Sequence, residues 1–446
     1  MKTTHWIYAV VLTSALSGCS VQTSQKDEAP KTLAVEQGHS ATAPYFTYDN
    51  AGNPVLCWTQ KHPTDGSNRL VFATYDASSA NFAAPIAVAG SDGSSAAPES
   101  MSKIAFKNDG TIVAVFAKPF LHEKSPFAGA IYFSISSDGG VSWSPPNFLH
   151  ADTAHHYGRN FFDIARLKNG EVGAVWLDGR DKSIEGSTLY FATTAPNRGF
   201  VEETVIHRGT CECCRTDLLV DKQGFIHVAY RSLTYPAALF GEQARDMAYV
   251  RSEDNGRTFS TETLISADNW AIRACPHTGP TLASENGRTH AVWFTAGGTP
   301  GLYYTHNRPD NQQFAERLLL TATGSHPQSL AMGTDTVLVV YENRPMPSTA
   351  HHTATHGGMH NHAKHEDVSG TDAGSQILLH PIINGHPTEP IAISSNQAFN
   401  HHPVIAQVGN VALVAWVCEE KEGSTIVYKR IHMDEINQSP ASARSD

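Results

Sequence analysis

The chain has 446 residues, a length compatible with one large repeat domain, and carries 32 Lys and Arg against 43 Asp and Glu. The formal net charge is −11. This acidic balance disfavours nucleic acid and anionic membrane surfaces as partners, because both would repel the chain. No long stretch shows helical periodicity, which favours an all-β fold.

The first 19 residues are predicted to be a processing signal. Lys2 precedes an apolar run from Ile7 to Leu16 that is too short to span a bilayer. The following Leu16-Ser-Gly-Cys19 resembles the lipobox of bacterial lipoproteins. The resemblance implies cleavage before Cys19 and lipidation of that residue. Ser20 then favours the outer membrane, because it is not the Asp that marks inner-membrane retention. A plain secretory leader is the alternative. Residues 20–31 are polar and predict a flexible tether.

Residues 32–432 are predicted to form an all-β domain of repeated units. Short Val/Ile/Tyr/Phe-rich runs recur roughly every fifty residues, separated by Gly, Pro and Asn. One strand of each unit ends in an aromatic residue, and these residues are Trp58, Phe116, Trp176, Tyr230, Trp293, Tyr341 and Trp416. Repeats of this length with four short strands each are typical of a β-propeller.

Seven four-stranded antiparallel blades account for the repeats, and six is the alternative because the sixth unit is irregular. The last unit lacks a fourth strand, which Thr32–Val35 can supply. Such closure pairs the two ends of the domain and leaves no open edge around the ring. Residues 433–446 are predicted to be a disordered tail.

Two turns between the third and fourth strands carry a specific pattern. They read Ser136-Ser-Asp138-Gly-Gly140-Val-Ser-Trp143 and Ser252-Glu-Asp254-Asn-Gly256-Arg-Thr-Phe259. The Asp is placed to accept backbone N–H groups, the Gly to take positive φ, and the ring to pack under the hairpin. Both fit the Asp-box pattern, and the chain resembles the sialidase/neuraminidase superfamily over residues 32–432. The resemblance implies a propeller whose active site lies on the face opposite these structural turns.

That opposite face holds almost every unusual residue. The segments leading into the inner strands of five successive units read His155-His-Tyr157-Gly-Arg159, Cys211-Glu-Cys213-Cys214-Arg215, Arg273-Ala-Cys275-Pro-His277, Ser325-His326-Pro and His401-His402-Pro. Because inner strands surround the axis of a propeller, each of these units is expected to bring a His or Cys to one mouth of the central channel.

A transition-metal site is the first hypothesis for this face. Cys and His are ligands of copper and zinc, and the adjacent fourth and fifth units bring together Cys211, Cys213, Cys214, Cys275 and His277. The C-x-C-C spacing is not that of a zinc ribbon and does not identify the metal. The alternative is a disulfide from Cys275 to one of the other three. Cys57 and Cys418, on second strands, are expected to be free thiols, with a disulfide between them as the alternative.

An insertion at 346–373 in the sixth unit holds further candidate ligands. Six histidines and one methionine fall within fifteen positions: His351, His352, His356, Met359, His360, His362 and His365. This composition suits capture of copper, nickel or zinc, and the methionine favours copper. A solvated insertion without a ligand is the alternative.

The sialidase resemblance implies a different use of the same face. Sialidases bind a carboxylate with three arginines and use a Tyr nucleophile and an Asp acid/base. The arginine candidates here are Arg159, Arg180, Arg215, Arg231 and Arg344. Tyr157 is the nearest nucleophile candidate, and Asp178 or Asp181 the nearest acid. The Phe/Tyr-Arg-Ile-Pro motif of many sialidases is absent, and ordinary ion pairing of the arginines is the alternative.

The sequence therefore predicts a cell-envelope lipoprotein, held at the membrane only by its lipid, that binds a transition metal, with copper favoured over zinc. Sialidase-like glycoside hydrolysis, or a metal-dependent redox reaction, is the second hypothesis. The third is a non-catalytic module that recognises an acidic glycan or an envelope protein. A monomer without a nucleic-acid partner is expected.

Overall fold

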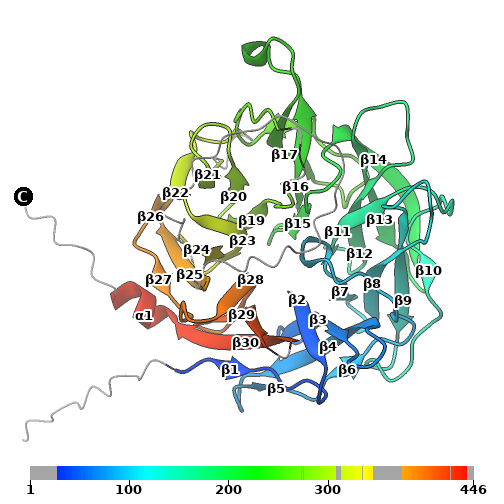
Figure 1. The fold of residues 1–446 in the computed structure, drawn as a ribbon, viewed down its shortest axis with the longest axis vertical. Helices are drawn as coiled ribbons and strands as arrows, with labels where there is room; N and C mark the ends of the chain where they lie inside the picture. The colour runs from blue at the N-terminus through cyan, green and yellow to red at the C-terminus, as the bar shows by residue number, and fades with distance from the viewer. Residues whose placement is uncertain are drawn as a thin grey trace, which may run out of the picture.

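The computed structural model describes residues 28–272, 274, 276–307, 313–333, 335–344, 374–421 and 423–438. In these residues the regular secondary structure is almost entirely β-strand, and the sheets radiate from a central axis (Figure 1). The predicted leader with Cys19 and the insertion at 346–373 lie outside the described residues. Within the described part of the chain, no helix is long and apolar enough to cross a membrane.

The strands follow one another as antiparallel meanders. The first unit contains β2 (Ser40–Tyr48), β3 (Pro54–Lys61), β4 (Asn68–Asp76), β5 (Asn81–Phe82) and β6 (Ile86–Ala87). After the 3-10 turn η1 (Pro98–Ser100), the second contains β7 (Lys103–Phe106), β8 (Ile112–Pro119), β9 (Gly129–Ser136) and β10 (Asn147–Phe148). The third contains β11 (Arg159–Arg166), β12 (Val172–Asp178), β13 (Ser187–Thr194) and β14 (Phe200–Thr210).

The later units repeat this order. The fourth contains β15 (Asp217–Val220), β16 (Ile226–Thr234), η2 (Ala237–Leu239), β17 (Ala244–Ser252) and β18 (Thr263–Leu264), and the fifth contains β19 (Thr281–Glu285), β20 (Arg288–Thr295), β21 (Gly301–His306) and β22 (Leu318–Thr321). The sixth contains β23 (Gly324–Ala331), β24 (Thr336–Asn343), β25 (Gln376–Ile383), β26 (His386–Pro387) and β27 (Ile391–Ala392). The last contains β28 (Phe399–Val408), β29 (Val411–Glu420) and β30 (Gly423–His432).

Six hydrogen-bonded sheets result from these meanders. One sheet is larger because β14 and β16 are joined at a single residue pair, Thr210 with Ser232, which connects the third and fourth units. The first strands of the units contact one another in a ring around the axis (Figure 1), in the order β2, β7, β11, β15, β19, β23 and β28. The prediction of an all-β fold with antiparallel sheets is confirmed.

The ring is closed by the N-terminal strand, as predicted. β1 (Lys31–Thr32) pairs antiparallel with β30 and becomes the fourth strand of the last sheet. The Leu33 N–H extends the pairing to the Ile426 carbonyl at 2.8 Å. Leu33 is buried in a cluster with Trp58 and Tyr428, so residues from both ends of the domain share one core.

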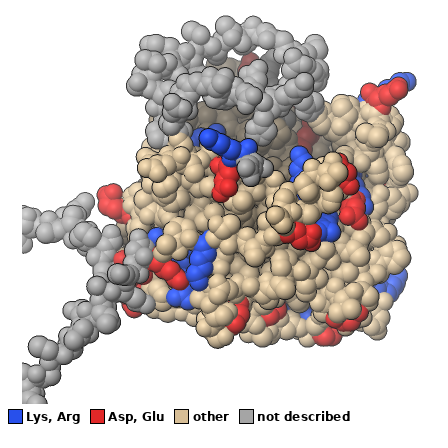
Figure 2. All heavy atoms as spheres, turned by 60° about the horizontal axis from the view of Figure 1, so that its bottom comes forward, with Lys and Arg blue, Asp and Glu red and all other residues tan. Residues whose placement is uncertain are grey.

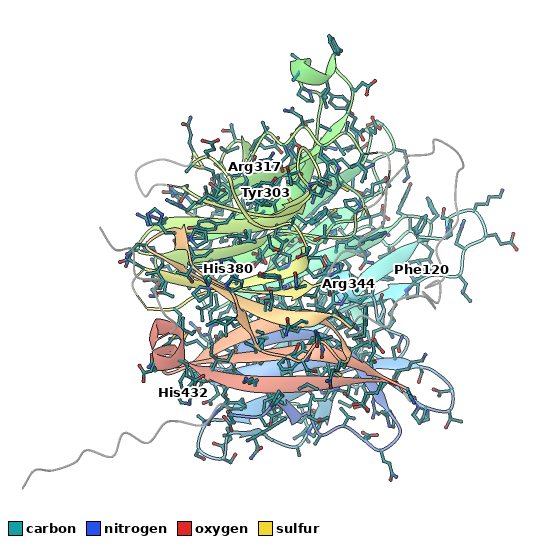
Figure 3. All side chains as sticks on the ribbon, turned by 60° about the vertical axis from the view of Figure 1, so that its left-hand side comes forward. Phe120, Tyr303, Arg317, Arg344, His380 and His432 are labelled. Atoms are coloured by element: carbon teal, nitrogen blue, oxygen red, sulfur yellow. The ribbon has the colours of Figure 1, made fainter. Side chains whose placement is uncertain are left out.

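The core lies between neighbouring sheets, where side chains fill the space from both sides (Figure 3). The aromatic residues that mark the repeat are all buried. Trp176 of β12, for example, packs in one cluster with Val115 of β8 and Ile131 of β9. Second strands are apolar on both faces because each of them is covered by a neighbouring sheet on either side.

Both Asp boxes have the predicted turn geometry. Asp138 accepts the Ser142 N–H at 2.9 Å, and Ser136 Oγ accepts the Gly140 N–H at 2.8 Å. The second box repeats these contacts around Asp254. The box aromatic does more than pack under its own hairpin. Trp143 meets Phe72 of the preceding unit edge to face at 6.3 Å, so the turn also ties two sheets together.

The predicted disordered tail at 433–446 requires a correction. Helix α1 (Met433–Gln438) follows β30 directly. Met433 and Ile436 are buried in a cluster with Val340 and Trp416, and this apolar contact holds the helix on the domain. Residues 439–446 lie outside the described part.

Candidate functional site

The inner strands share a local distortion at one mouth of the ring. The register of β2, β11, β23 and β28 shifts in each case across a residue in left-handed conformation, and these residues are Ala43, Phe161, His326 and His402, with φ between 48° and 53°. His277 takes the same conformation, with φ 46°, shortly before β19. Such β-bulges re-aim side chains and cost free energy when the residue is not glycine. The repeat therefore holds two imidazoles, His326 and His402, at strained, equivalent positions, whereas the register of β19 places Gly279, two residues after His277, at the corresponding position.

The cysteine loop lies between β14 and β15. Cys211, Cys213 and Cys214 are all buried, and the Cys211 Sγ lies 3.6 Å from Cys213 Sγ and 3.7 Å from Cys214 Sγ. The Cys211 N–H donates to the Arg231 carbonyl at 2.8 Å, which fixes the start of the loop against β16. The three predicted thiol ligands are thus brought together.

The Cys211 sulfur accepts hydrogen bonds from its surroundings. The Cys213 and Cys214 thiols, and then the Arg245 guanidinium at 3.2 Å, lower the pKa of Cys211 well below that of an ordinary thiol. Burial instead raises the pKa of Cys214, which favours its neutral thiol. The arrangement favours one thiolate shared among three sulfurs. A pocket of about 110 Å³ beside Cys211 is lined by Glu185, Thr210, Glu212, Gln243 and Arg245, among others.

Of the other predicted metal ligands, the structure describes His277 alone. His277 is exposed and belongs to none of the described groups of His, Cys, Asp and Glu close enough to share an ion. Cys275 lies outside the described residues, as do His351, His352, His356, Met359, His360, His362 and His365. Cys57 and Cys418 are free thiols.

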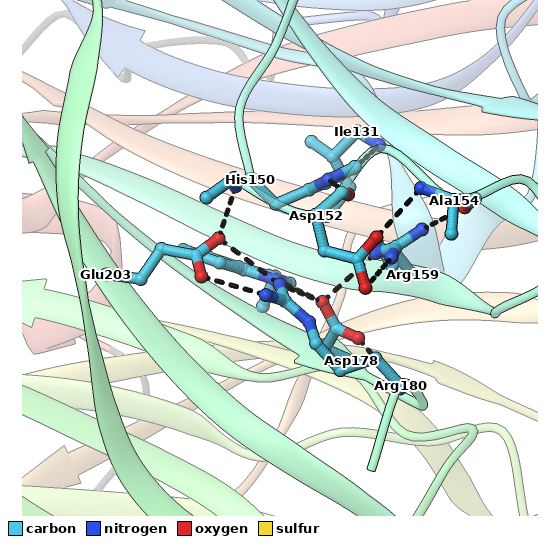
Figure 4. Close-up of polar contacts among 10 residues, drawn as sticks. Ile131, His150, Asp152, Ala154, Arg159, Asp178, Arg180 and Glu203 are labelled. Atoms are coloured by element: carbon cyan, nitrogen blue, oxygen red, sulfur yellow. Dashed lines mark hydrogen bonds and ion pairs between the residues drawn. The ribbon is translucent and has the colours of Figure 1, made fainter.

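Two of the predicted carboxylate-binding arginines are already occupied by protein carboxylates (Figure 4). Arg159 is fully buried, and its Nε lies 3.1 Å from Asp178 Oδ2. Arg180 donates to the same Asp178 oxygen at 2.5 Å and to Glu203 at 2.9 Å. Burial acts to raise the pKa of Asp178, but hydrogen bonds and charge from Arg180 outweigh it and lower that pKa. These contacts favour the carboxylate form of Asp178, whereas a general acid must hold a proton to donate.

The remaining three candidate arginines each have contacts of their own. Arg215 donates to the carbonyls of Pro280 and Pro327 at 3.2 and 3.1 Å. Arg231 is buried, donates to backbone carbonyls and lies over the Trp270 ring. Arg344 differs, because its side chain is 52 % exposed while its Nη2 lies 3.3 Å from Glu342.

The other two catalytic candidates have contacts of their own. The Tyr157 ring lies near the Arg159 guanidinium and the Lys182 ammonium, at 5.4 and 5.6 Å from its centroid. Asp181 pairs with Arg208, and hydrogen bonds from Ser183 lower its pKa. Asp181 is thus also ionised, which does not suit a general acid.

A second convergence of ionisable groups lies where β23 and β28 meet. The His326 and His402 rings are 4.2 Å apart between centroids. Glu342 lies between the two segments: its Oε1 is 3.1 Å from His326 Nδ1, and its Oε2 accepts the His402 N–H at 3.2 Å. Glu99 of η1 belongs to the same place, because one of its oxygens and one nitrogen of each of these imidazoles lie within 4.8 Å of one another. Sequence reasoning missed Glu99, since nothing in Ala97-Pro98-Glu99-Ser100 marks it as a ligand.

Comparisons with known proteins show a likeness of fold. No family model matches the chain, and no curated sequence matches it. Among solved structures, an ulvan lyase of polysaccharide lyase family PL25 is similar, with a TM-score of 0.53 and 11 % identity over 91 % of this chain and 94 % of that one. The polysaccharide lyase Uly1 has a TM-score of 0.52 and 9 % identity over 94 % of each chain. A Hadza microbial sialidase has a TM-score of 0.47 and 12 % identity over 86 % of this chain and 78 % of that one. The chain thus shares the all-β, propeller-like fold of these polysaccharide lyases.

Proposed function

We propose that this chain is a transition-metal-binding protein of the bacterial cell envelope, built as a seven-bladed propeller and anchored through a lipid on Cys19. The observation that supports it most directly is the group of three buried thiols, Cys211, Cys213 and Cys214, within 4.8 Å of one another. Three soft donors on one short loop form a site that favours copper(I) or zinc over harder ions.

The sulfur separations fit a metal better than a disulfide. In a tetrahedral site with Zn–S bonds of about 2.3 Å, neighbouring sulfurs lie about 3.8 Å apart. The observed separations of 3.6 and 3.7 Å from Cys211 Sγ are close to that value. A disulfide would need about 2.05 Å.

Charge supports the same proposal. Three thiolates around copper(I) or zinc leave the site anionic, and the Arg245 guanidinium 3.2 Å from Cys211 Sγ offsets part of that charge. Copper is the preferred ion in this proposal, because the insertion at 346–373 combines histidines with Met359 and would deliver copper to the thiols.

The test is metal analysis of untagged protein, reconstituted anaerobically with copper(I) or zinc under reducing conditions. The double variant Cys213→Ser/Cys214→Ser is expected to bind one equivalent less than the wild type, while Cys57→Ser, which removes a buried thiol elsewhere, keeps the full amount. If the double variant and the wild type bind the same number of metal equivalents, the proposal is wrong. The ion bound more tightly in a copper–zinc competition identifies the metal.

A second candidate function is recognition of an acidic glycan. It rests on Arg344, whose half-exposed guanidinium pairs with Glu342 beside His326 and His402, and on the fold likeness to an ulvan lyase whose structure is bound to -[GlcA(1-4)Rha3S]-. On the face seen in Figure 2, basic and acidic side chains are interspersed. Binding of acidic oligosaccharides that is lost in Arg344→Ala supports it, and binding unchanged in that variant contradicts it.

A further inference from the structure

We propose a second metal site, distinct from the cysteine loop, in which Glu99, His326 and His402 bind a divalent cation of borderline character at the axis of the ring. Two imidazoles and one carboxylate form a donor set that suits zinc, iron(II), cobalt(II) or nickel(II). The cysteine loop offers only sulfur, so the two sites differ in the ions they prefer.

The three donors come from three separate units. Glu99 lies in η1 before the second unit, His326 in β23 and His402 in β28. One ligand atom from each lies within 4.8 Å of the other two. These side chains meet only because the fold closes into a ring, and an ion held by them would connect the start of the second unit with the sixth and last units.

The surroundings of each imidazole match those of metal ligands. Histidines that bind metals usually engage their second ring nitrogen with a carboxylate or another polar group, which orients the ring. His326 Nδ1 lies 3.1 Å from Glu342 Oε1, and His402 Nδ1 lies 2.6 Å from His401 Nδ1. His401 in turn contacts Glu419 at 2.9 Å through Nε2. His326 Nδ1 thus faces a carboxylate and His402 Nδ1 a second imidazole, and in this proposal Nε2 of each ring is the ligand nitrogen.

Glu99 is a buried carboxylate with little compensation from the protein. It is only 7 % exposed, it accepts the Gly279 N–H at 3.1 Å, and the Arg215 Nε lies 3.9 Å from its carboxylate, beyond hydrogen-bond distance. A buried charge is costly unless it is paired and hydrogen-bonded. A divalent cation between Glu99 and the two imidazoles supplies the missing charge.

The backbone supports the same assignment. His326 and His402 occupy the same left-handed bulge position on neighbouring inner strands, with φ 49° and 48°. Each is followed by proline, which fixes the backbone beyond the bulge. Backbone strain of this kind persists where the surrounding structure determines it, and it concentrates at functional sites.

The test uses cobalt(II), which reports its ligands through absorption. It is performed in a background in which the six histidines of 351–365 are changed to Gln, since these would otherwise bind the probe. Cobalt at the cysteine loop gives an intense thiolate-to-cobalt charge-transfer band, whereas cobalt at Glu99, His326 and His402 gives only weak ligand-field bands. In this background Cys213→Ser/Cys214→Ser is expected to bind one cobalt ion without the charge-transfer band.

Adding His326→Gln/His402→Gln to that protein is expected to weaken the remaining binding by at least a hundredfold, whereas His386→Gln, at an exposed histidine, leaves it unchanged. Cobalt binding that survives the His326→Gln/His402→Gln change, or its complete absence in the cysteine variant, overturns the proposal. If the histidine variant does not fold, X-ray absorption of the cobalt-loaded cysteine variant decides: a shell of nitrogen and oxygen with two imidazoles supports the site, and any other shell rejects it.

Discussion

The Arg245 guanidinium donates to the Cys211 sulfur across 3.2 Å. Arg245 lies in β17, and the cysteine loop leads into β15, so the third strand of the fourth unit supplies the charge for a sulfur at the entrance of the same unit. A cation at this distance stabilises the thiolate, which is the form of cysteine that binds metals.

Arg245→Leu is expected to raise the pKa of Cys211 in metal-free protein by about one unit or more, because it removes that charge and leaves only the hydrogen bonds from Cys213 and Cys214. The ultraviolet absorbance of thiolate, followed against pH, measures the shift. Cys57 is an internal reference, since burial raises its pKa to about 12. Arg251→Gln, a change elsewhere on β17, is the control, and identical titration curves for Arg245→Leu and the wild type would refute the assignment.

Lys103→Met is expected to destabilise the protein by about 3–5 kcal/mol, because it leaves the Asp163 carboxylate buried without its cation. Lys103 is 1 % exposed, and its Nζ lies 3.0 Å from Asp163 Oδ1. The double variant Lys103→Met/Asp163→Asn should recover part of the loss. Lys222→Met, which breaks a 3.2 Å pair from a lysine that is 78 % exposed, should cost less than about 1 kcal/mol. Urea denaturation measures all four proteins, and equal losses for Lys103→Met and Lys222→Met would contradict the prediction.

The stability of the protein is expected to depend on pH through Asp217. Burial, together with the neighbouring Asp163 charge, raises the pKa of Asp217 to about 7. The folded protein therefore holds a proton that the unfolded chain loses at much lower pH. The contribution that neutral Asp217 makes to the free energy of unfolding is present at acidic pH and is lost as the pH rises toward 7.

Asp217→Asn keeps an oxygen that can accept the Leu282 N–H and carries no charge. The difference in free energy of unfolding between Asp217→Asn and the wild type should therefore shift in favour of the variant by at least about 1 kcal/mol when the pH is raised from 5 to 8. In Asp109→Asn the difference from the wild type should stay constant over this range, because hydrogen bonds from Thr111 lower the pKa of Asp109. A constant difference for Asp217→Asn would show that this carboxyl is ionised throughout.

Two neighbouring glycines of the first Asp box offer a matched test of packing. Both have positive φ, but a Cβ at Gly139 meets nothing within 4 Å, whereas one at Gly140 lies 3.1 Å from Ile86 and Phe72. Gly139→Ala should cost about 1–2 kcal/mol from backbone strain alone. Gly140→Ala should cost about 1 kcal/mol more, because the first sheet must move as well. Thermal denaturation compares the stabilities of the two variants. A smaller loss of stability in Gly140→Ala than in Gly139→Ala would show that Ile86 and Phe72 leave room for the added Cβ.

The repeat was predictable from sequence because it is periodic. Trp58, Trp176 and Trp416 end equivalent strands, and the need for each sheet to be covered on both sides makes those strands uniformly apolar. The closing strand was predictable for the same reason, since the last unit was one strand short. The helix α1 was not, because it owes its position to only two apolar contacts, through Met433 and Ile436.

The candidate sites were predictable only in part. The three cysteines are close in sequence, so their proximity in space required only one loop. The carboxylates were harder to foresee: Glu99 reaches His326 and His402 from a turn more than two hundred residues away. His277 is also left-handed, but it lies two residues before the bulge position of the other histidines, and its side chain is exposed. Tertiary packing determines the direction in which a side chain points from a distorted strand. The pattern of residues in the sequence does not contain that information.

The junction between β1 and β30 has a mechanical consequence. Its backbone pairing consists of two residue pairs, Lys31 with Tyr428 and Thr32 with Val427, and one further hydrogen bond from Leu33, and the Glu28 carboxylate adds an ion pair with Arg430 of β30. A force applied to the chain before residue 31 acts on this short strand pairing before it acts on the longer strands of the sheets. If the domain is tethered by its first residues, the pairing of β1 with β30 is therefore expected to separate first under force. Leu33, buried in a cluster with Trp58 and Tyr428, opposes that separation.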